Sequence, residues 1–246
     1  MRAGSSNGVV QLASTMIPKK IHYCWFGGTA LRPLHLRCRD SWLKFHPEWE
    51  FVFWDERNAP LHIPVIAQAL KDRRWNHVSD WTRLWALQEQ GGVYLDTDVE
   101  LVHALDPVLD DACFLGFQTP QPTPWWINCA VFGGGAGHPF FGRLWERMLA
   151  ENPPGIYKTV QPEVATLLLR EAGLSSYGDQ TIDAVRIHPH EVFYPYSWLQ
   201  SPHAKYIKPE TIAVHHWEGT WIAPKDRIKF RVKRWLQRFG LRESKV

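Results

Sequence analysis

Short apolar runs alternate with longer helical patterns along this chain, and this alternation restricts its fold more than any other feature. In the first half, the sequence predicts strands at residues 20–28, 49–54 and 93–95 and helices at residues 33–47 and 79–92. Ser79 is the expected N-cap of the last helix, and Gly91 is its expected C-cap. Because strands and helices follow one another in turn, we expect an α/β fold with a mostly parallel central sheet flanked by helices. Ligands of such a sheet bind beyond the carboxyl ends of its strands.

The length and composition are those of a folded protein. The 246 residues are 45% hydrophobic and 22% charged, which excludes a disordered or fibrous chain. In the second half, the sequence predicts strands at residues 113–117, 127–135 and 213–217, a strand-rich stretch at residues 185–196, and helices at residues 138–151 and 162–173. The expected division is a loose leader at residues 1–16, one main domain at residues 17–224 and a basic segment at residues 225–246.

Other features of the composition exclude several classes of protein. No run approaches the roughly 18 apolar residues that a membrane-spanning helix needs, so we expect no transmembrane segment. The four cysteines include no Cys-x-x-Cys pair, which excludes zinc-ribbon and redox motifs and predicts reduced, buried thiols in a cytoplasmic protein. Outside the basic segment, negative charges exceed positive ones by about four, so no nucleic-acid partner is expected.

The segment at residues 225–245 combines strong positive charge with a helical apolar pattern. It contains nine Lys or Arg residues and two acidic residues. The apolar residues on one face of the predicted helix are Ile228, Val232, Trp235, Leu236 and Phe239. A basic amphipathic helix of this kind suits an anionic membrane surface, which would place the protein peripherally at the inner face of the plasma membrane. The alternative is that the apolar face packs on the main domain.

The most informative motif is Asp96-Thr97-Asp98, which directly follows the predicted strand at residues 93–95. In an extended segment, the side chains of Asp96 and Asp98 point the same way, with their Cα atoms roughly 7 Å apart. Two carboxylates at a strand end can hold one Mn²⁺ or Mg²⁺ ion, which takes its remaining ligands from water and phosphate. The motif therefore indicates a site for a metal and a diphosphate. The alternative is a solvated turn, because Asp-x-Asp alone is common.

Four blocks of sequence together resemble a known family of enzymes. In chain order they are IPKKIHYCWFGG (17–28), SDWTRLWALQEQGGVYLDTDVEL (79–101), INCAVFGGGAGHP (127–139) and AVHHWEGTW (213–221). They are similar to blocks of the DXD-containing sugar transferases grouped as glycosyltransferase family 32, which includes capsular-polysaccharide transferases and initiating mannosyltransferases. The resemblance implies a fold of the GT-A type, with residues 17–224 as the catalytic domain.

The same resemblance implies a reaction. It is the metal-dependent transfer of a hexosyl unit from a nucleoside diphosphate sugar to a hydroxyl of a glycan or lipid-linked sugar, as in polysaccharide biosynthesis. The family implies that the anomeric configuration is retained. A UDP-sugar is the favoured donor, and GDP-mannose is the alternative.

The resemblance further implies which residues bind the donor. Trp25 would stack on the nucleobase, with the backbone of Phe26 and Gly27 near the nucleotide. The alternative for Trp25 is a core residue that closes the sheet. Asp80 and Arg83 share one face of a helix and would bind donor hydroxyls and the diphosphate. The alternative is an acidic residue near a helix N-terminus that pairs with a neighbouring arginine.

The resemblance also implies metal ligands and a closing loop. Asp98 and His216 would ligate the metal, and Asp96 would bind it through water or hold the ribose. Because His215 and His216 point in opposite directions in an extended segment, one of the two is expected to be structural. Further expected contacts with the donor are Thr97, Thr220 and Trp221, and Asn128 is expected beside the reacting sugar.

Two other functions stay open at this point. A metal-dependent nucleotide-sugar hydrolase or phosphodiesterase could use the same carboxylates, and a non-catalytic sugar-binding protein could use some of the 14 tryptophans. Between residues 153 and 166 many family members carry Gly-Pro followed by Thr, whereas this chain carries Val160-Gln161-Pro162-Glu163 and Thr166. That region is expected near the acceptor, so the identity of the acceptor is open.

Overall fold

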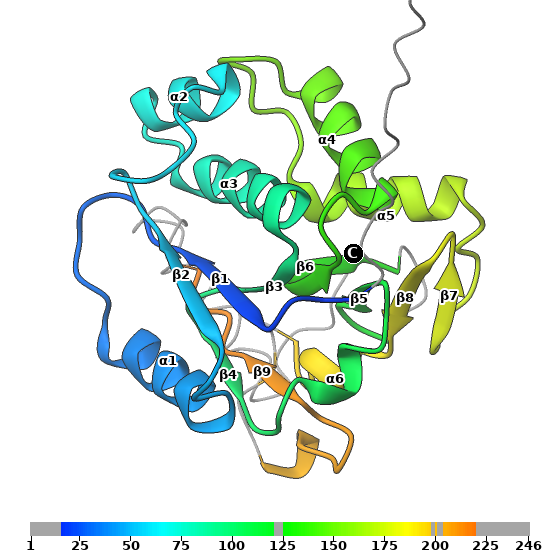
Figure 1. Ribbon diagram of the computed structural model, residues 1–246. Helices are drawn as coiled ribbons and strands as arrows, with labels where there is room; N and C mark the ends of the chain where they lie inside the picture. The colour runs from blue at the N-terminus through cyan, green and yellow to red at the C-terminus, as the bar shows by residue number, and fades with distance from the viewer. Residues whose placement is uncertain (1–15, 121–124, 198–199, 201–203, 220–246) are drawn as a thin grey trace, which may run out of the picture.

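The computed structural model describes residues 16–120, 125–197, 200 and 204–219, and a seven-stranded sheet lies at its centre (Figure 1). The strands lie in the order β2-β1-β3-β6-β5-β8-β7. Their bounds are β1 Lys20–Cys24, β2 Glu50–Trp54, β3 Gly92–Leu95, β5 Cys113–Phe117, β6 Ile127–Gly134, β7 Gln180–Ile182 and β8 Val185–His188. Strands β1, β2, β3, β5 and β8 run in one direction, and β6 and β7 run against them. The expected α/β fold with a mostly parallel sheet is confirmed.

Helices and a small ribbon cover the two faces of this sheet. The helices are α1 Pro33–Phe45, α2 Pro64–Lys71, α3 Trp75–Gln90, α4 Pro139–Glu151, α5 Gln161–Glu171 and α6 His190–Phe193, and the ribbon pairs β4 Val99–Leu101 with β9 Ala213–His215. In Figure 1, α2, α3, α4 and α5 lie on one side of the sheet, and α1, α6 and the ribbon lie on the other. Two buried clusters match this division, one containing Trp81 and Leu144 and the other containing Trp42 and Val99.

A glycine pair joins α3 directly to β3. Gly91 and Gly92 have φ angles of +63° and +108°, in the region that favours glycine. A Cβ on Gly91 would lie 2.7 Å from the backbone nitrogen of Ala136, and a Cβ on Gly92 would lie 2.7 Å from the carbonyl oxygen of Lys20. Only glycine meets both requirements, so this pair determines where β3 begins. The predicted C-cap at Gly91 is confirmed.

The predicted N-cap of the same helix is wrong. α3 begins at Trp75, so Ser79 lies inside the helix and Asp80 lies beyond its first turn. The helix extends backwards because Val78 is fully buried and Trp75 packs against the same core. The hydroxyl of Ser79 instead lies 3.2 Å from the hydroxyl of Tyr94 on β3. Burial of the preceding apolar residues therefore outweighs the capping preference of serine.

Other expectations have mixed outcomes. The strand-rich stretch at residues 185–196 contains β8 and then the short helix α6, because Pro189 ends the strand and stands at the N-cap of the helix. All four cysteines are free and buried, as expected. In the part of the chain that the structure describes, no helix is both long and apolar enough to cross a membrane. Apart from Met16, the predicted leader lies outside the described residues, as does the basic segment.

Candidate functional site

The Asp-x-Asp motif lies in a turn at the carboxyl end of β3. The backbone N–H of Val99, the first residue of β4, donates to the carbonyl oxygen of Asp96 at 2.9 Å. The predicted extended conformation is therefore wrong, because the chain has to turn here from the central sheet into the β4–β9 ribbon. The turn nevertheless brings one side-chain oxygen of Asp96 within 4.8 Å of one of Asp98.

His215 completes this cluster from the end of β9. Its Nε2 lies 3.2 Å from Oδ1 of Asp98, and the same group of ligand atoms includes Asp96. The sequence predicted His216 in this position. In the structure, Nε2 of His216 lies 2.8 Å from Oε2 of Glu100 instead, because neighbouring side chains of extended chain point to opposite sides. The structure thus places His215, and not His216, beside the two aspartates.

The surroundings shift the pKa values of all three groups. Burial raises the pKa of Asp96, although the charge of Arg83 opposes this. Burial acts in the same direction on Asp98, but His215 and a hydrogen bond from the backbone of Glu218 lower the pKa of Asp98 well below its usual range. Burial would lower the pKa of His215, but the charge and hydrogen bond of Asp98 raise it. Asp98 is therefore held as a carboxylate.

The donor atoms of the cluster fit Mn²⁺ or Mg²⁺. Asp96, Asp98 and His215 each offer one ligand atom, and these atoms all lie within 4.8 Å of one another. Carboxylate oxygens suit both ions, and the imidazole nitrogen favours Mn²⁺. The side chains of Asp96 and Asp98 are 28% and 13% exposed, so water or phosphate can reach the same point.

Arg83 connects this cluster to Asp80. One guanidinium nitrogen lies 2.6 Å from Oδ1 of Asp80, and the other lies 3.3 Å from Oδ1 of Asp96 and donates to the carbonyl oxygen of Cys129 at 2.9 Å. The side chains of Asp80 and Arg83 are only 5% and 9% exposed. Because Asp80 lies beyond the first turn of α3, attraction to the helix N-terminus does not account for the pair. The structure brings together the predicted donor-binding pair and the first aspartate of the motif.

Trp25 follows β1, whose carboxyl end lies at the same edge of the sheet as that of β3 because the two strands are parallel. Its side chain is half-buried and belongs to neither buried cluster. One of its neighbours is His35, at a ring-centroid distance of 4.5 Å. Phe26 is buried in the core, and the backbone N–H of Gly27 donates to Oε1 of Glu56 at 2.6 Å. Of these residues, Trp25 therefore keeps a side chain within reach of a ligand.

The structure describes two of the remaining predicted residues, Asn128 and Thr97. Asn128 is buried in β6, where its oxygen accepts from the backbone N–H of Ala130 at 2.7 Å and its NH₂ donates to Gln118 at 3.1 Å. Thr97 is partly exposed in the turn between the two aspartates. Thr220 and Trp221 lie outside the described residues.

The sequence analysis did not identify Glu218, which contacts Asp98, or the two residues that contact the carboxylate of Glu218. The backbone N–H of Glu218 donates to Oδ2 of Asp98 at 2.8 Å, and the carboxylate of Glu218 contacts Arg32 and His35. Glu218 lies within the block at residues 213–221, which is a signal that could have identified it. No motif in the sequence marks Arg32 or His35.

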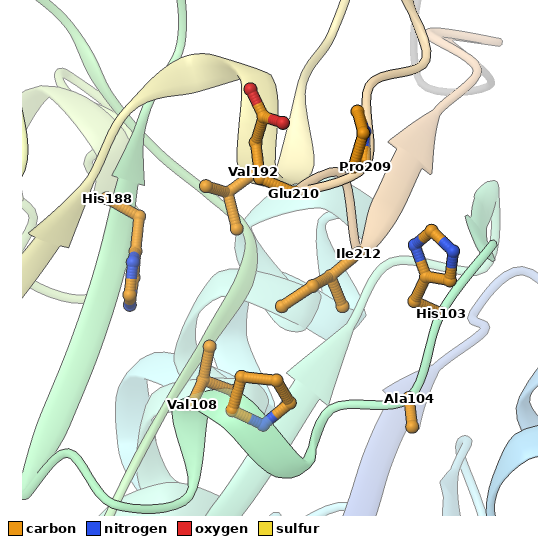
Figure 2. A pocket seen from close by; sticks show the side chains of 9 residues that line it. His103, Ala104, Val108, His188, Val192, Pro209, Glu210 and Ile212 are labelled. Carbon is orange, nitrogen blue, oxygen red and sulfur yellow. The ribbon is translucent and has the colours of Figure 1, made fainter.

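A separate pocket of about 430 Å³ lies between the segment after β4, the end of β8 with α6, and the segment before β9 (Figure 2). Its lining residues are His103, Ala104, Pro107, Val108, His188, Val192, Pro209, Glu210 and Ile212. Figure 2 shows His103 and His188 on opposite walls, with Val108 and Ile212 between them. None of the residues of the Asp-x-Asp cluster lines this pocket.

Comparison with known protein families decides how the site is classified. Residues 34–115 match the family described as "Glycosyltransferase sugar-binding region containing DXD motif". This part of the chain is therefore similar to the sugar-binding region of the DXD-containing glycosyltransferases. This DXD region includes Asp80, Arg83, Asp96 and Asp98, which are the residues that the structure brings together.

Two curated relatives and one solved structure are also similar to this chain. "Inositol phosphoceramide mannosyltransferase 3" of Schizosaccharomyces pombe is 29% identical over 132 residues, which are 52% of this chain and 36% of that protein. "Alpha-1,4-N-acetylglucosaminyltransferase" of Homo sapiens is 28% identical over 138 residues, which are 54% of this chain and 38% of that protein. The structure of "PaToxG Glycosyltransferase" matches with a TM-score of 0.52 at 16% identity, covering 63% of this chain and 70% of that chain. The chain spans little more than a third of these two relatives, and the structural match confirms the glycosyltransferase type of fold.

Proposed function

We propose that this protein is a metal-dependent glycosyltransferase that moves a hexosyl unit from a nucleoside diphosphate sugar to an acceptor hydroxyl. The observation that carries the proposal is the cluster of Asp96, Asp98 and His215 at the carboxyl end of β3, in contact with Arg83. Carboxylates, an imidazole and a guanidinium at the end of a parallel strand suit a metal-bound diphosphate. A sugar-binding protein without a nucleotide donor would need no such cluster.

Asp98 and His215 would hold the metal directly, and Asp96 would hold it directly or through water. When bound, the metal supplies positive charge that stabilises the departing diphosphate. Arg83 places a second positive charge beside Asp96, and its planar guanidinium can bind a phosphate or sugar oxygen. Oδ2 of Asp80 accepts the backbone N–H of Gln161 at 3.4 Å and can accept a further hydrogen bond from a sugar hydroxyl. The ion pair holds the side chains of Asp80 and Arg83 in place before the donor binds. The entropic cost of orienting the donor is therefore lower.

Trp25 would provide the surface on which the nucleobase stacks. It lies at the same sheet edge as the motif, and stacking on an aromatic ring tolerates any base. We favour a UDP-sugar over GDP-mannose, although the two relatives are named for a mannosyl and an N-acetylglucosaminyl unit. Retention of the anomeric configuration, a glycan or lipid-linked acceptor and a location at the inner face of a membrane belong to the same proposal. Proton NMR of the product tests the configuration.

Calorimetric titration and an assay of free-sugar release together separate the three functions that the sequence leaves open. A transferase should bind UDP or GDP only weakly without Mn²⁺ and much more tightly with it. If no nucleotide binds in a metal-dependent manner, the proposal is wrong, and glycan binding in the absence of nucleotide would support the non-catalytic alternative. A hydrolase would release free sugar from a nucleotide sugar at the same rate with and without an acceptor.

A further inference from the structure

One glutamate joins the Asp98 side of the site to the beginning of α1. Oε1 of Glu218 lies 2.8 Å from Nη1 of Arg32, and Oε2 lies 2.5 Å from Nε2 of His35. The backbone N–H of Arg32 donates to Nδ1 of His35, so Nε2 of His35 carries the hydrogen that is donated to Glu218. The side chain of His35 has no exposed area. Two residues far away in the sequence therefore hold the carboxylate of Glu218 in place.

The backbone around Glu218 holds Asp98. The N–H of Glu218 donates to Oδ2 of Asp98 at 2.8 Å, and the N–H of His216 donates to the carbonyl oxygen of Asp98 at 2.9 Å. Between them, Trp217 has a φ angle of +54°, which a tryptophan rarely adopts. A strained residue of this kind persists only where surrounding contacts fix it. Here the indole N–H donates to the carbonyl oxygen of Tyr196 at 2.9 Å, and its ring lies 4.2 Å from that of His215.

This arrangement selects the orientation of the Asp98 carboxylate. Because Oδ2 accepts the N–H of Glu218, Oδ1 is the oxygen that faces Nε2 of His215, at 3.2 Å. His35, which contacts the carboxylate of Glu218, also contacts Trp25, the residue proposed to stack on the nucleobase. The ring centroids of His35 and Trp25 lie 4.5 Å apart. Figure 1 shows α1 and β9, the elements that these contacts connect, on the same side of the sheet.

We propose that Glu218 is a positioning residue of the donor site. Through Arg32 and His35, it fixes the turn that orients Asp98 toward the metal, and it fixes His35 against Trp25. The metal side and the nucleobase side of the site are thereby held in one arrangement. This inference rests on the proposed function, because it requires that Asp98 ligates a metal and that Trp25 contacts the donor.

The test compares Mn²⁺ binding by the full-length protein and its variants, with saturating UDP and with saturating GDP. The variants are Glu218→Gln, Arg32→Gln and the double variant, and the matched control is Glu151→Gln. Glu151 contacts Arg147 at 2.8 Å with similar exposure, and it lies on α4. We expect Glu218→Gln to weaken Mn²⁺ binding about tenfold, as is typical when a residue that orients a metal ligand is lost.

The Mn²⁺ affinities expected for these variants differ from those expected if the ion pair between Glu218 and Arg32 only stabilised the fold. Arg32→Gln should weaken Mn²⁺ binding, and the double variant should bind about as tightly as Glu218→Gln alone, because the two residues act through one contact. Glu151→Gln should leave Mn²⁺ binding unchanged, although it also removes a glutamate charge from an ion pair with arginine.

Four outcomes would overturn the inference. Unchanged Mn²⁺ affinity in a folded Glu218→Gln protein would do so, as would losses that simply add in the double variant. If Glu218→Gln does not fold, Arg32→Gln decides, and an unchanged affinity there would reject the role. If the wild-type protein does not bind Mn²⁺, the proposed function is rejected as well. If the wild-type protein and the variants bind Mn²⁺ with the same affinity, only the positioning role is rejected.

Discussion

Replacing His22 with glutamine should make the fold less sensitive to acid. His22 is fully buried on β1, where its Nε2–H donates to the carbonyl oxygen of Gly91 at 2.9 Å and its Nδ1 accepts the indole N–H of Trp54 at 3.1 Å. A protonated imidazole carries a hydrogen on both nitrogens, so Nδ1–H would face the indole N–H. The hydrogen bonds of the folded state therefore require the neutral ring.

The magnitude follows from the pKa of this group. Burial lowers the pKa of His22 from 6.5 to about 4. In the folded state His22 therefore stays neutral in a range where the unfolded chain binds a proton, so protons favour unfolding. Its stability contribution is complete above about pH 6.5 and is lost as the pH falls toward 4. At about 1.4 kcal/mol per pH unit, the total loss is about 3 kcal/mol.

The assay is urea unfolding of the full-length wild-type and His22→Gln proteins at about pH 7 and about pH 4. Glutamine at this position costs packing at both pH values, so only the change between them is compared. Wild type should lose about 3 kcal/mol more stability than the variant over this interval. His62→Gln, at an exposed position, is the control and should behave as wild type. Equal losses in the wild-type and His22→Gln proteins would refute the reasoning.

The remaining predictions concern the site. Asp98→Asn should lower transfer at least about 100-fold, because it removes a charge at the metal. It should also lower stability, because His215 loses its charged partner, so transfer is measured under conditions in which the variant is folded. Residual activity above a few per cent would reject the metal assignment. His215→Ala should weaken Mn²⁺ binding at least about tenfold, whereas His216→Ala should leave it nearly unchanged, and calorimetry would show the reverse if His216 were the ligand. Trp25→Ala should weaken nucleotide binding by about 1–3 kcal/mol, measured by the same titration. An unchanged nucleotide affinity in the folded Trp25 variant would mean that no base stacks on this residue.

Local chemistry in the sequence determined the part of the site that belongs to one stretch of chain. Gly91 ends α3 because its backbone adopts a conformation that favours glycine, and β3 follows at once as an apolar strand. The Asp-x-Asp motif therefore comes at the carboxyl end of a buried strand wherever that strand lies in the sheet. Asp80 and Arg83 meet because they are three residues apart on one helix, which is also a local property.

Only the tertiary structure decided which residues from other parts of the chain join them. His215 and His216 are chemically identical neighbours, and the pairing of β9 with β4 determines which of them faces Asp98. The packing of α1 against the β4–β9 ribbon brings His35 into contact with Glu218, although the two residues are 183 positions apart in the sequence. Sequence patterns report burial and local conformation. Contacts between distant side chains depend on the register and packing of whole elements, and no single stretch of sequence records these.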